Sequence, residues 1–448
     1  MVTKYFYEIF NNNLDENALI FNNKKYNYSD LIENINYWKL EIDNNNIKKG
    51  ETVALFGDFS FNTISILFAL IDNENIIVPL DFSHKNKSEN KLDIAFVNRI
   101  ISVNKVDDVE FSEIDKNYVP HSYYDTLKNE SKPGLVLFTS GTSGNPKAAV
   151  HDLELLLKKF KAKKRSFKTL NFLLFDHWGG LNTMFHTLSN AGVVLALKDR
   201  RPGTICSYIE KYGIELLPTS PSFLNVLLIS EEYKKYNLSS LILITYGSEP
   251  MPQSTLIKIK NLFPEIRLLQ TYGLIELGVL SSKSKSNDSL WVKVGGEGFQ
   301  TRVVDNLLEI KSKSAMLGYL NAPSPFTKDN WFMTGDEVEV DGDYIRILGR
   351  KSELINVGGE KVYPQEVENI ILKLNNVAEV RVYSKKNPII GNMICADIRL
   401  IKAEDKKEFI SRLKYFCKQN MEKFKIPVKI EIVQNDQFND RFKKVRSI

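Results

Sequence analysis

Apolar runs of two kinds alternate along the first two thirds of the chain. Short runs typical of buried strands, at 53–57 and 76–80, enclose a stretch at 64–71 whose apolar residues have helical spacing. The same alternation returns later, with strand-like runs at 193–197, 214–217, 241–246 and 267–270. Because strands that alternate with helices usually pair side by side, this pattern predicts parallel sheets covered by helices.

After about residue 290 the pattern changes to short strands separated by glycine and aspartate turns. Asp341-Gly342 lies between two such runs and predicts a tight hairpin. From residue 353 the expected order is helix, strand, strand, helix, strand, at 365–374, 377–383, 393–400, 406–421 and 428–433. The chain therefore predicts an α/β fold. A large N-terminal domain of stacked parallel α/β sheets plus a small β-rich region would span 1–350, and a small mobile α+β domain would span 351–448.

Composition and charge are those of a folded globular protein. Hydrophobic residues make up 43% and charged residues 26%, and the net charge of +5 is too small to indicate nucleic-acid or membrane-surface binding. No run reaches the roughly 18 apolar residues that a membrane helix needs, and the N-terminus turns polar early. Cys206, Cys395 and Cys417 lie far apart, which predicts free, buried thiols. We expect a cytoplasmic protein with no membrane span and no nucleic-acid partner.

The segment 138–147, FTSGTSGNPK, places hydroxyls and glycines directly after an apolar run. Glycine lets backbone N–H groups turn toward an anion, Ser and Thr add donors, and Lys147 adds a positive charge, so the loop suits a polyphosphate. A Gly/Ser surface loop is the simpler alternative. The loop differs from a Walker A loop, because Pro146 and Ala148 flank the lysine. The candidate ligands are Thr139, Ser140, Gly141, Thr142, Ser143, Gly144 and Lys147.

This loop resembles the phosphate loop of the adenylate-forming superfamily, which includes acyl- and aryl-CoA synthetases, luciferases and amino-acid adenylation domains. Similar segments follow in the family's order at 245–250 (TYGSEP), 270–278 (QTYGLIELG), 316–323 (MLGYLNAP), 331–350 (WFMTGDEVEVDGDYIRILGR) and 355–368 (INVGGEKVYPQEVE). The resemblance covers essentially the whole chain. It implies an AMP-forming acid–thiol ligase, similar to acyl-CoA synthetases, that uses ATP and Mg²⁺ to convert a small carboxylic acid to an acyl-adenylate. The acyl group would then pass to CoA or to the phosphopantetheine of a separate acyl carrier protein.

The resemblance also implies roles for single residues. Thr142 would assist catalysis from the phosphate loop, and Glu276 would bind Mg²⁺ as a hard oxygen ligand. Asp336 would hold both ribose hydroxyls, and Arg350 would reach the ribose and a phosphate with its planar fork. The adenine would lie between the loop Gly247, Ser248, Glu249 and Pro250 and the segment Thr271, Tyr272 and Gly273.

Two further segments are placed by the resemblance near the C-terminus. Gly358 and Gly359 would let a narrow pantetheine arm pass close to the backbone, or they form an ordinary hairpin turn. In the tail NDRFKKVRSI, Phe442 replaces a family glycine, but the family's Lys-to-Arg spacing is kept from Lys443. We therefore choose Lys443 as the catalytic lysine, with a solvated basic tail as the alternative.

The sequence leaves the substrate class open. His177, followed by Gly180, has the His-x-x-Gly spacing of CoA ligases, whereas Phe175-Asp176 resembles the amino-acid adenylation domains, whose aspartate binds the substrate ammonium. We favour His177 as a catalytic gate and keep a stand-alone amino-acid adenylating enzyme that loads a carrier protein as the alternative. Ile275 stands where the family has a hydroxyl that contacts the α-phosphate. Such a hydrogen bond is worth ~1.5–3 kcal/mol, so adenylation is expected to be slower by roughly one to two decades.

Overall fold

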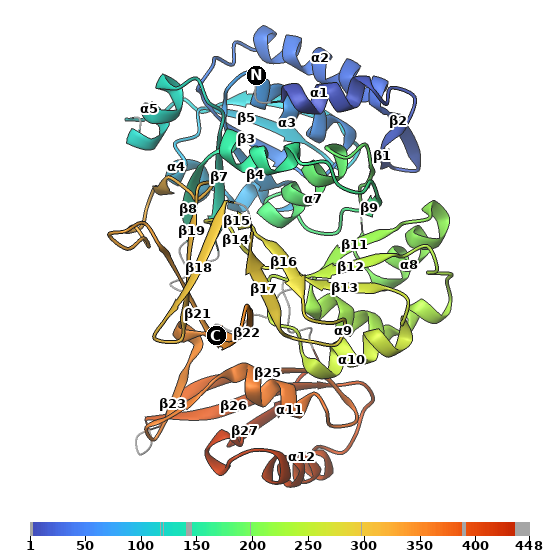
Figure 1. Ribbon diagram of the computed structural model, residues 1–448, viewed down its shortest axis with the longest axis vertical. Helices are drawn as coiled ribbons and strands as arrows, with labels where there is room; N and C mark the ends of the chain where they lie inside the picture. The colour runs from blue at the N-terminus through green and yellow to red at the C-terminus, as the bar shows by residue number, and fades with distance from the viewer. Residues whose placement is uncertain are drawn as a thin grey trace.

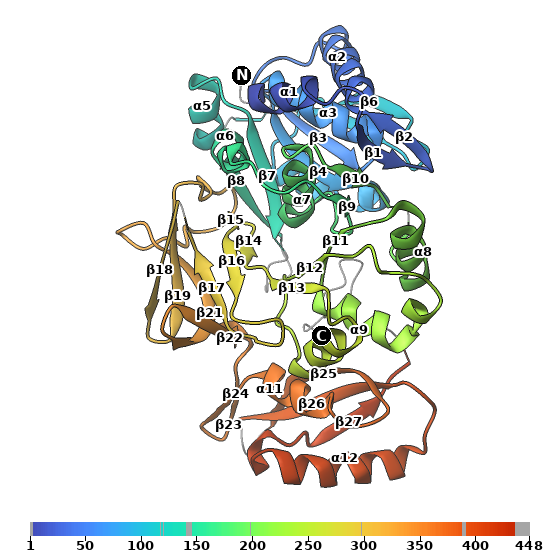
Figure 2. The same ribbon diagram turned by 45° about the vertical axis from the view of Figure 1, so that its right-hand side comes forward.

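The computed structural model describes residues 3–116, 118–119, 121–139, 146–197, 199–296, 298–387 and 391–434. Figures 1 and 2 show the blue N-terminal residues at one end of the molecule and the red C-terminal residues at the other, with the yellow residues between them. The predicted site residues come from all of these parts, so the order of the sheets decides which of them meet.

The first sheet carries the predicted phosphate loop. Its strands are β3 (Thr52–Gly57), β4 (Ile76–Asp81), β5 (Arg99–Val103), β6 (Val109–Glu113), β7 (Gly134–Thr139), β8 (Lys147–Asp152) and β20 (Gly318–Tyr319). They lie in the order β20-β8-β7-β4-β3-β5-β6. The four central strands β7, β4, β3 and β5 are parallel, whereas β20, β8 and β6 pair antiparallel. The central strands are continuous apolar runs because both faces of the sheet are covered.

The second sheet carries the predicted adenine segments. Its strands are β1 (Asn17–Phe21), β2 (Lys24–Asn27), β9 (Lys168–Leu170), β10 (Val193–Leu195), β11 (Leu216–Thr219), β12 (Leu243–Tyr246) and β13 (Arg267–Gln270), in the order β13-β12-β11-β9-β10-β1-β2. All neighbours except β1 and β2 are parallel. The helices α8 (Pro202–Tyr212), α9 (Pro221–Ser230) and α10 (Gln253–Leu262) pack into one core with this sheet.

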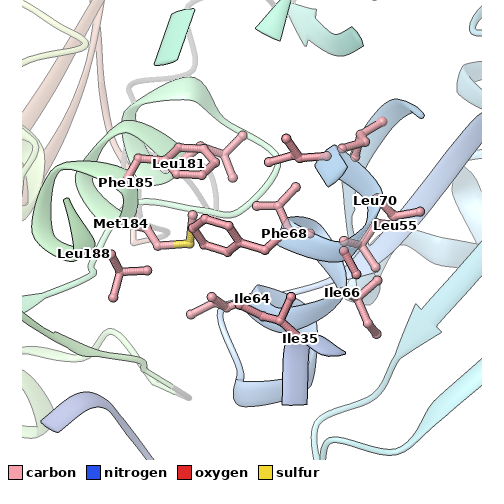
Figure 3. Packing of buried hydrophobic residues seen from close by; sticks show 14 of the residues in the cluster. Ile35, Leu55, Ile64, Ile66, Phe68, Leu70, Leu181, Met184, Phe185 and Leu188 are labelled. Atoms are coloured by element: carbon pink, nitrogen blue, oxygen red, sulfur yellow. The ribbon is translucent and has the colours of Figure 1, made fainter. Parts of the chain in front are cut away.

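Several of the remaining N-terminal helices build the core that joins the two sheets. They are α1 (Lys4–Asn11), α2 (Tyr28–Asn44), α3 (Phe61–Asp72), α6 (Leu153–Leu157) and α7 (Trp178–Leu188). The helices α4 (Glu89–Ile94) and α5 (Ser122–Asn129) belong instead to a separate core with the first sheet. Ser60 starts α3 by accepting a hydrogen bond from the Thr63 N–H. Figure 3 shows Phe68 of α3 pointing toward Met184 and Phe185 of α7, and the two phenylalanine rings lie 5.7 Å apart. This packing holds α7 against α3.

A six-stranded antiparallel sheet follows a short hairpin of β14 (Gly273–Leu274) and β15 (Gly278–Val279). Its strands are β16 (Ser281–Ser284), β17 (Val292–Gly295), β18 (Phe299–Val304), β19 (Leu307–Ser312), β21 (Phe332–Asp341) and β22 (Tyr344–Arg350). The expected hairpin at Asp341-Gly342 joins β21 to β22, and Gly342 has a φ of +59°, which favours glycine. The long β21–β22 pair brings Asp336 opposite Arg350.

The C-terminal elements form an α+β unit with its own core. They are β23 (Ile355–Val357), β24 (Glu360–Val362), α11 (Pro364–Ile371), β25 (Val377–Asn387), β26 (Gly391–Leu400), α12 (Lys406–Asn420) and β27 (Lys429–Ile432). Val367, Phe409 and Leu413 are fully buried in this core. The Asn225 side-chain amide on α9 donates a 2.8 Å hydrogen bond to the Ala378 carbonyl of this unit. The expected division at residues 350 and 351 and the mobility of the unit stay predictions.

The predicted α/β class is confirmed, with stacked, largely parallel sheets, a β-rich region and a C-terminal α+β unit. The expected strand at 214–217 is shifted, because β11 begins at Leu216. The expected strand at 377–383 is longer, because β25 pairs with β26 as far as Asn387. Cys206, Cys395 and Cys417 are buried and free, as expected. Within the described part of the chain, no helix is both long and apolar enough to span a bilayer.

Candidate functional site

The predicted phosphate loop connects two neighbouring antiparallel strands. Thr139 ends β7, Lys147 begins β8, and the two residues are cross-strand partners. The two ends of the loop therefore meet at one point of the first sheet. The loop residues Ser140, Gly141, Thr142, Ser143 and Gly144, and Lys443 in the tail, lie outside the described residues. Their roles stay predictions.

A tyrosine connects this loop to the predicted metal ligand. The Tyr319 hydroxyl donates a hydrogen bond to Oε1 of Glu276, and the Lys147 ammonium lies 5.4 Å from the centre of the Tyr319 ring. Tyr319 is held here because β20 pairs with β8 directly after the loop. Burial, followed by the charge of Glu276, raises the pKa of Tyr319, so its hydroxyl remains a hydrogen-bond donor at neutral pH. The basic and acidic groups thus share one aromatic neighbour.

A second cluster is built on the β21–β22 pair. Arg350 Nε lies 3.4 Å from Oδ1 of Asp336, and the Tyr272 hydroxyl donates a 2.6 Å hydrogen bond to Oδ2 of the same carboxylate. Asp336 and Tyr272 are each only 6% exposed. Burial raises the pKa of Asp336, while Arg350 and the Tyr272 hydrogen bond oppose that rise. The carboxylate is therefore a fixed, buried acceptor, which is the chemistry that sugar hydroxyls need.

The two clusters are adjacent. Tyr272 precedes β14, and Glu276 lies in the turn between β14 and β15. The charge of Glu276 contributes to the raised pKa of Asp336 and acts on Arg350 as well, so these groups are within electrostatic reach of one another. The structure therefore brings together residues that the sequence predicted from three separate segments: Lys147, Tyr272, Glu276, Asp336 and Arg350.

The predicted adenine loop follows the carboxyl end of β12, next to the carboxyl end of β13, where parallel sheets commonly bind ligands. A Cβ on Gly247 would lie 2.5 Å from Thr271 Oγ1 and 2.7 Å from its carbonyl oxygen, so the two segments touch closely. Ser248 has a φ of +72°, and Glu249 Oε1 accepts a 2.7 Å hydrogen bond from the Ser222 N–H. Pro250 directly follows Glu249 in the first segment, and Gly273 ends the second segment. The structure thus holds both predicted adenine segments side by side.

Ile275 is used for packing. Its half-buried side chain lies against the core between the two sheets and against the core of the β-rich region. The nearby hydroxyl of Thr271 donates to the Tyr246 carbonyl at 3.1 Å. Ile275 thus serves as a packing residue, and its effect on adenylation stays a prediction.

The predicted gate lies at the start of α7. His177 is the N-cap residue, and its Nδ1 accepts a 3.2 Å hydrogen bond from the Gly179 N–H. Asp176 is 6% exposed, whereas His177 is half-buried. A Cβ on Gly278 would lie 3.1 Å from Trp178 Nε1, so the start of α7 packs against β15. The structure thus places Trp178 against the β14–β15 hairpin, and the roles of Asp176 and His177 stay predictions.

Gly358 and Gly359 form the tip of the β23–β24 hairpin. Their φ angles are +61° and +98°, and no atom lies within 4 Å of a Cβ placed on either residue. The glycines are thus required by the turn and by no close neighbour. The hairpin lies apart from β14 and β15 in Figures 1 and 2, so the structure does not bring this pair to the cluster. The pantetheine role stays a prediction.

Glu276 fits a magnesium ion that arrives with a nucleotide. Among the described residues there is no group of three or more His, Cys, Asp or Glu side chains that could hold a metal. Mg²⁺ typically uses one or two carboxylates, with substrate phosphates and water completing its shell. Glu276 has one oxygen bonded to Tyr319, and a carboxylate retains further lone pairs for a metal.

Two residues that contact this site had been assigned no role from the sequence. Tyr319 and Asn321 both belong to the segment 316–323, which resembles a family motif but for which the resemblance implied no residue roles. The Asn321 side chain accepts a 3.0 Å hydrogen bond from the Ala148 N–H and donates a 2.9 Å bond to the Pro146 carbonyl. In the sequence, the signal for these residues was the position of Gly318-Tyr319 in a segment that resembles a family motif.

A cavity of about 690 Å³ lies elsewhere. Tyr5, Asp72, Pro133 and Lys158 are among the residues that line it, and none of the predicted site residues does. It is at the Gly134 end of β7, opposite the end that carries the phosphate loop. We therefore do not assign the predicted reaction to it.

Comparisons with known proteins give a family match. A family model described as "AMP-binding enzyme" matches residues 84–311, and one described as "AMP-binding enzyme C-terminal domain" matches residues 366–442. An indoleacetate–CoA ligase of Aromatoleum aromaticum is 29% identical over 59% of this chain and 56% of its own length. The mitochondrial medium-chain acyl-CoA ligase ACSF2 of Mus musculus is 27% identical over 67% of this chain and 54% of its own length. The chain thus spans about half the length of these two relatives.

A 2-succinylbenzoate–CoA ligase of Listeria innocua matches nearly end to end, with 26% identity over 94% of this chain and 93% of its own length. Solved structures are similar in fold. The anthranilate CoA ligase AuaEII in complex with anthranoyl-AMP has a TM-score of 0.81 at 16% identity, covering 99% of this chain and 95% of that one. An ATP-bound RpMatB-BxBclM chimera also has a TM-score of 0.81, at 21% identity, covering 98% and 97%.

Proposed function

Because the chain belongs to the AMP-binding enzyme family, we propose that it activates a small carboxylic acid with ATP and passes the acyl group to a thiol. In the first step the carboxylate attacks the α-phosphorus, giving an acyl-adenylate and pyrophosphate. In the second step the thiol attacks the acyl carbon and AMP leaves.

The observation that carries this proposal is the single cluster around the β14–β15 hairpin. Attack of a carboxylate on a phosphate brings two anions together, so the site must supply cations and oriented donors. Lys147 and Arg350 supply positive charge, and Asp336 is a buried acceptor positioned by Tyr272. In our proposal Lys147 binds the triphosphate, Asp336 binds the ribose hydroxyls, and Arg350 bridges the ribose and a phosphate.

Glu276 is proposed as the protein ligand of Mg²⁺. The bound ion would neutralise phosphate charge without any proton transfer. The chain itself contributes the orientation of the Glu276 carboxylate, through the Tyr319 hydroxyl.

We propose CoA as the acyl acceptor, because the relatives described above are CoA ligases by name. A separate carrier protein is the other possible source of the thiol. His177 is proposed to act at the gate of the acid pocket. Cytoplasmic location, expected from the sequence, is also kept as a proposal.

The division into a core domain, 1–350, and a mobile domain, 351–448, is proposed together with Lys443 as a lysine that acts in one domain orientation. Lys443→Ala should greatly slow adenylation and leave thioester formation from supplied acyl-adenylate largely intact. If Lys444→Ala produced this selective loss instead, the assignment of the tail would be wrong by one residue.

The test is exchange of labelled pyrophosphate into ATP over a panel of aryl, fatty and amino acids. We expect exchange that requires both an acid and Mg²⁺, and at least about a 100-fold loss in Glu276→Gln, as when an interaction with developing charge is removed. Glu339→Gln, which changes a half-buried carboxylate on β21 that pairs with Arg346, is the matched control and should keep full exchange.

Thioester analysis by mass spectrometry, with CoA or a carrier protein that bears a free phosphopantetheine thiol as acceptor, then identifies the thiol. Pyrophosphate exchange that occurs with amino acids and with no other acid of the panel would favour the carrier-loading alternative. If the protein binds ATP but no acid of the panel supports exchange, the proposed ligase activity is refuted.

A further inference from the structure

The segment Met316–Asn321, which we call the bracket, contacts Glu276 at two places. The Met316 N–H donates a 2.8 Å hydrogen bond to the Glu276 carbonyl, and the Tyr319 hydroxyl donates to the Glu276 carboxylate. Both the backbone and the side chain of the predicted metal ligand are therefore held by one short segment. A carboxylate fixed at one oxygen has its other oxygen directed rather than free to rotate.

The same segment holds Lys147. The ammonium lies 5.4 Å from the centre of the Tyr319 ring, a favourable position for a cation over an aromatic face. Asn321 bonds to the backbone on both sides of the lysine, at the Pro146 carbonyl and the Ala148 N–H. The Leu320 N–H adds a 2.9 Å bond to the Ala148 carbonyl. The exit of the phosphate loop is thus clamped where Lys147 begins β8.

We propose that Tyr319 and Asn321 are positioning residues for the metal–nucleotide complex, Tyr319 acting through Glu276 and Asn321 acting through Lys147. This inference rests on the proposed function, because it needs ATP and Mg²⁺ to bind at these two charged groups. It assigns separate roles to two neighbours on the bracket: one sets how tightly the metal is held, and the other sets how well the phosphates are held.

The test of Tyr319 measures binding rather than turnover. Titration calorimetry would follow the binding of α,β-methylene-ATP, an analogue that cannot transfer its adenylyl group to an acid, at a series of Mg²⁺ concentrations. Tyr319→Phe keeps the ring and removes the hydroxyl. Loss of a residue that orients a metal ligand typically lowers metal affinity 10- to 100-fold, so the Mg²⁺ concentration for half-maximal binding should rise by about tenfold or more. At saturating Mg²⁺ the analogue should bind as to the unchanged protein.

Tyr383→Phe is the matched control. The Tyr383 hydroxyl also donates to a carboxylate, Oδ1 of Asp397 at 3.0 Å, and Tyr383 and Tyr319 are each 8% exposed. Tyr383 lies on β25 of the C-terminal unit, so its substitution should leave the Mg²⁺ dependence unchanged. The control measures what loss of such a hydrogen bond does to the protein in general.

A double variant tests whether Tyr319 acts through Glu276. In a Glu276→Gln background, Tyr319→Phe should add no further shift in Mg²⁺ dependence, because the group that it positions is gone. Additive shifts would overturn this part of the inference.

Asn321→Ala should show the complementary pattern. It should weaken analogue binding by roughly threefold to tenfold at saturating Mg²⁺, as when one or two hydrogen bonds of ordinary strength are lost, and leave the Mg²⁺ midpoint in place. The inference would be overturned if Tyr319→Phe had the same Mg²⁺ dependence as Tyr383→Phe. It would also be overturned if Asn321→Ala bound the analogue as tightly as the unsubstituted protein. An unchanged protein that binds no analogue at any Mg²⁺ concentration would instead overturn the proposed function, and this inference with it.

Discussion

Tyr272→Phe tests the ribose cluster, because it removes one hydroxyl from a buried carboxylate and leaves the ring in place. Asp336 accepts a 2.6 Å hydrogen bond from Tyr272 and faces Arg350 at 3.4 Å. A hydrogen bond to a charged group contributes ~1.5–3 kcal/mol, and one between neutral groups ~0.5–1.5 kcal/mol. At a pH high enough to ionise Asp336, the free energy of unfolding should therefore fall by about 2 kcal/mol.

The effect should depend on pH in a defined direction. The pKa of Asp336 is raised in the folded protein, chiefly by burial, so the stability linked to its protonation is present below the ordinary aspartate pKa and is lost as the pH rises through the folded value. Tyr272 opposes that rise by donating to the carboxylate. Removing its hydroxyl should therefore cost more above the folded pKa of Asp336 than below it, by about 1 kcal/mol, the difference between the two classes of hydrogen bond.

The assay is urea unfolding over a series of pH values, with Tyr124→Phe as control. The Tyr124 hydroxyl donates a 2.9 Å bond to the Ala95 carbonyl and the residue is also buried, but its acceptor is neutral. Its substitution should cost the same at every pH in the series. A Tyr272→Phe loss that is independent of pH, or that becomes smaller as the pH rises, would refute the view that the hydroxyl stabilises an ionised Asp336.

Three further predictions concern activity. Ile275→Thr should speed pyrophosphate exchange by roughly tenfold through an added hydroxyl, and should lower stability by about 1 kcal/mol through lost apolar contact, with exchange rate and unfolding midpoint measured together. Gly358→Ala and Gly359→Ala should each lower local stability by ~1–2 kcal/mol because of their positive φ angles. If pantetheine passes here, both substitutions should also lower the rate of thioester formation, measured by stopped flow, and leave the rate of adenylation unchanged. Asp176→Asn should keep the rate of pyrophosphate exchange within a few fold, and His177→Ala should impair chiefly thioester formation. A rise of ~100-fold in the Michaelis constant of Asp176→Asn for an amino acid would instead favour the amino-acid hypothesis.

The fold followed from the sequence where local pattern decides structure. The run 267–270 became β13 with the predicted bounds, because a short apolar run between turn residues has few alternatives. The strand β20 was not predicted. It has only two residues, and it exists because Gly318 and Tyr319 pair with β8, far away in the sequence. No periodicity marks a strand that a distant partner creates.

The site was predicted as a set of residues but not as a set of contacts. The bond from Tyr272 to Asp336 joins residues 64 positions apart, and the bond from Tyr319 to Glu276 joins residues 43 positions apart. Such pairs depend on sheet order and register, which the motifs do not contain. The resemblance of their segments to family motifs identified Glu276 and Asp336, because a motif carries residue type and order. A tyrosine such as Tyr319 is more often a core residue, and so its contact with Glu276 was missed.

The β14–β15 hairpin explains why one small element can organise the site. Two strands of two residues each have almost no stability of their own, so the hairpin must be held by its neighbours. Tyr272 ties its start to the β-rich sheet through Asp336, and Glu276 ties its turn to the bracket. Gly278 rests against Trp178 of α7, and Ile275 packs between two cores. The residue that lacks the family's hydroxyl is therefore one of the anchors of the hairpin. Its apolar side chain stabilises the position of the proposed metal ligand and supplies no donor to a phosphate, so on the proposed function the same turn would set both binding geometry and chemical rate.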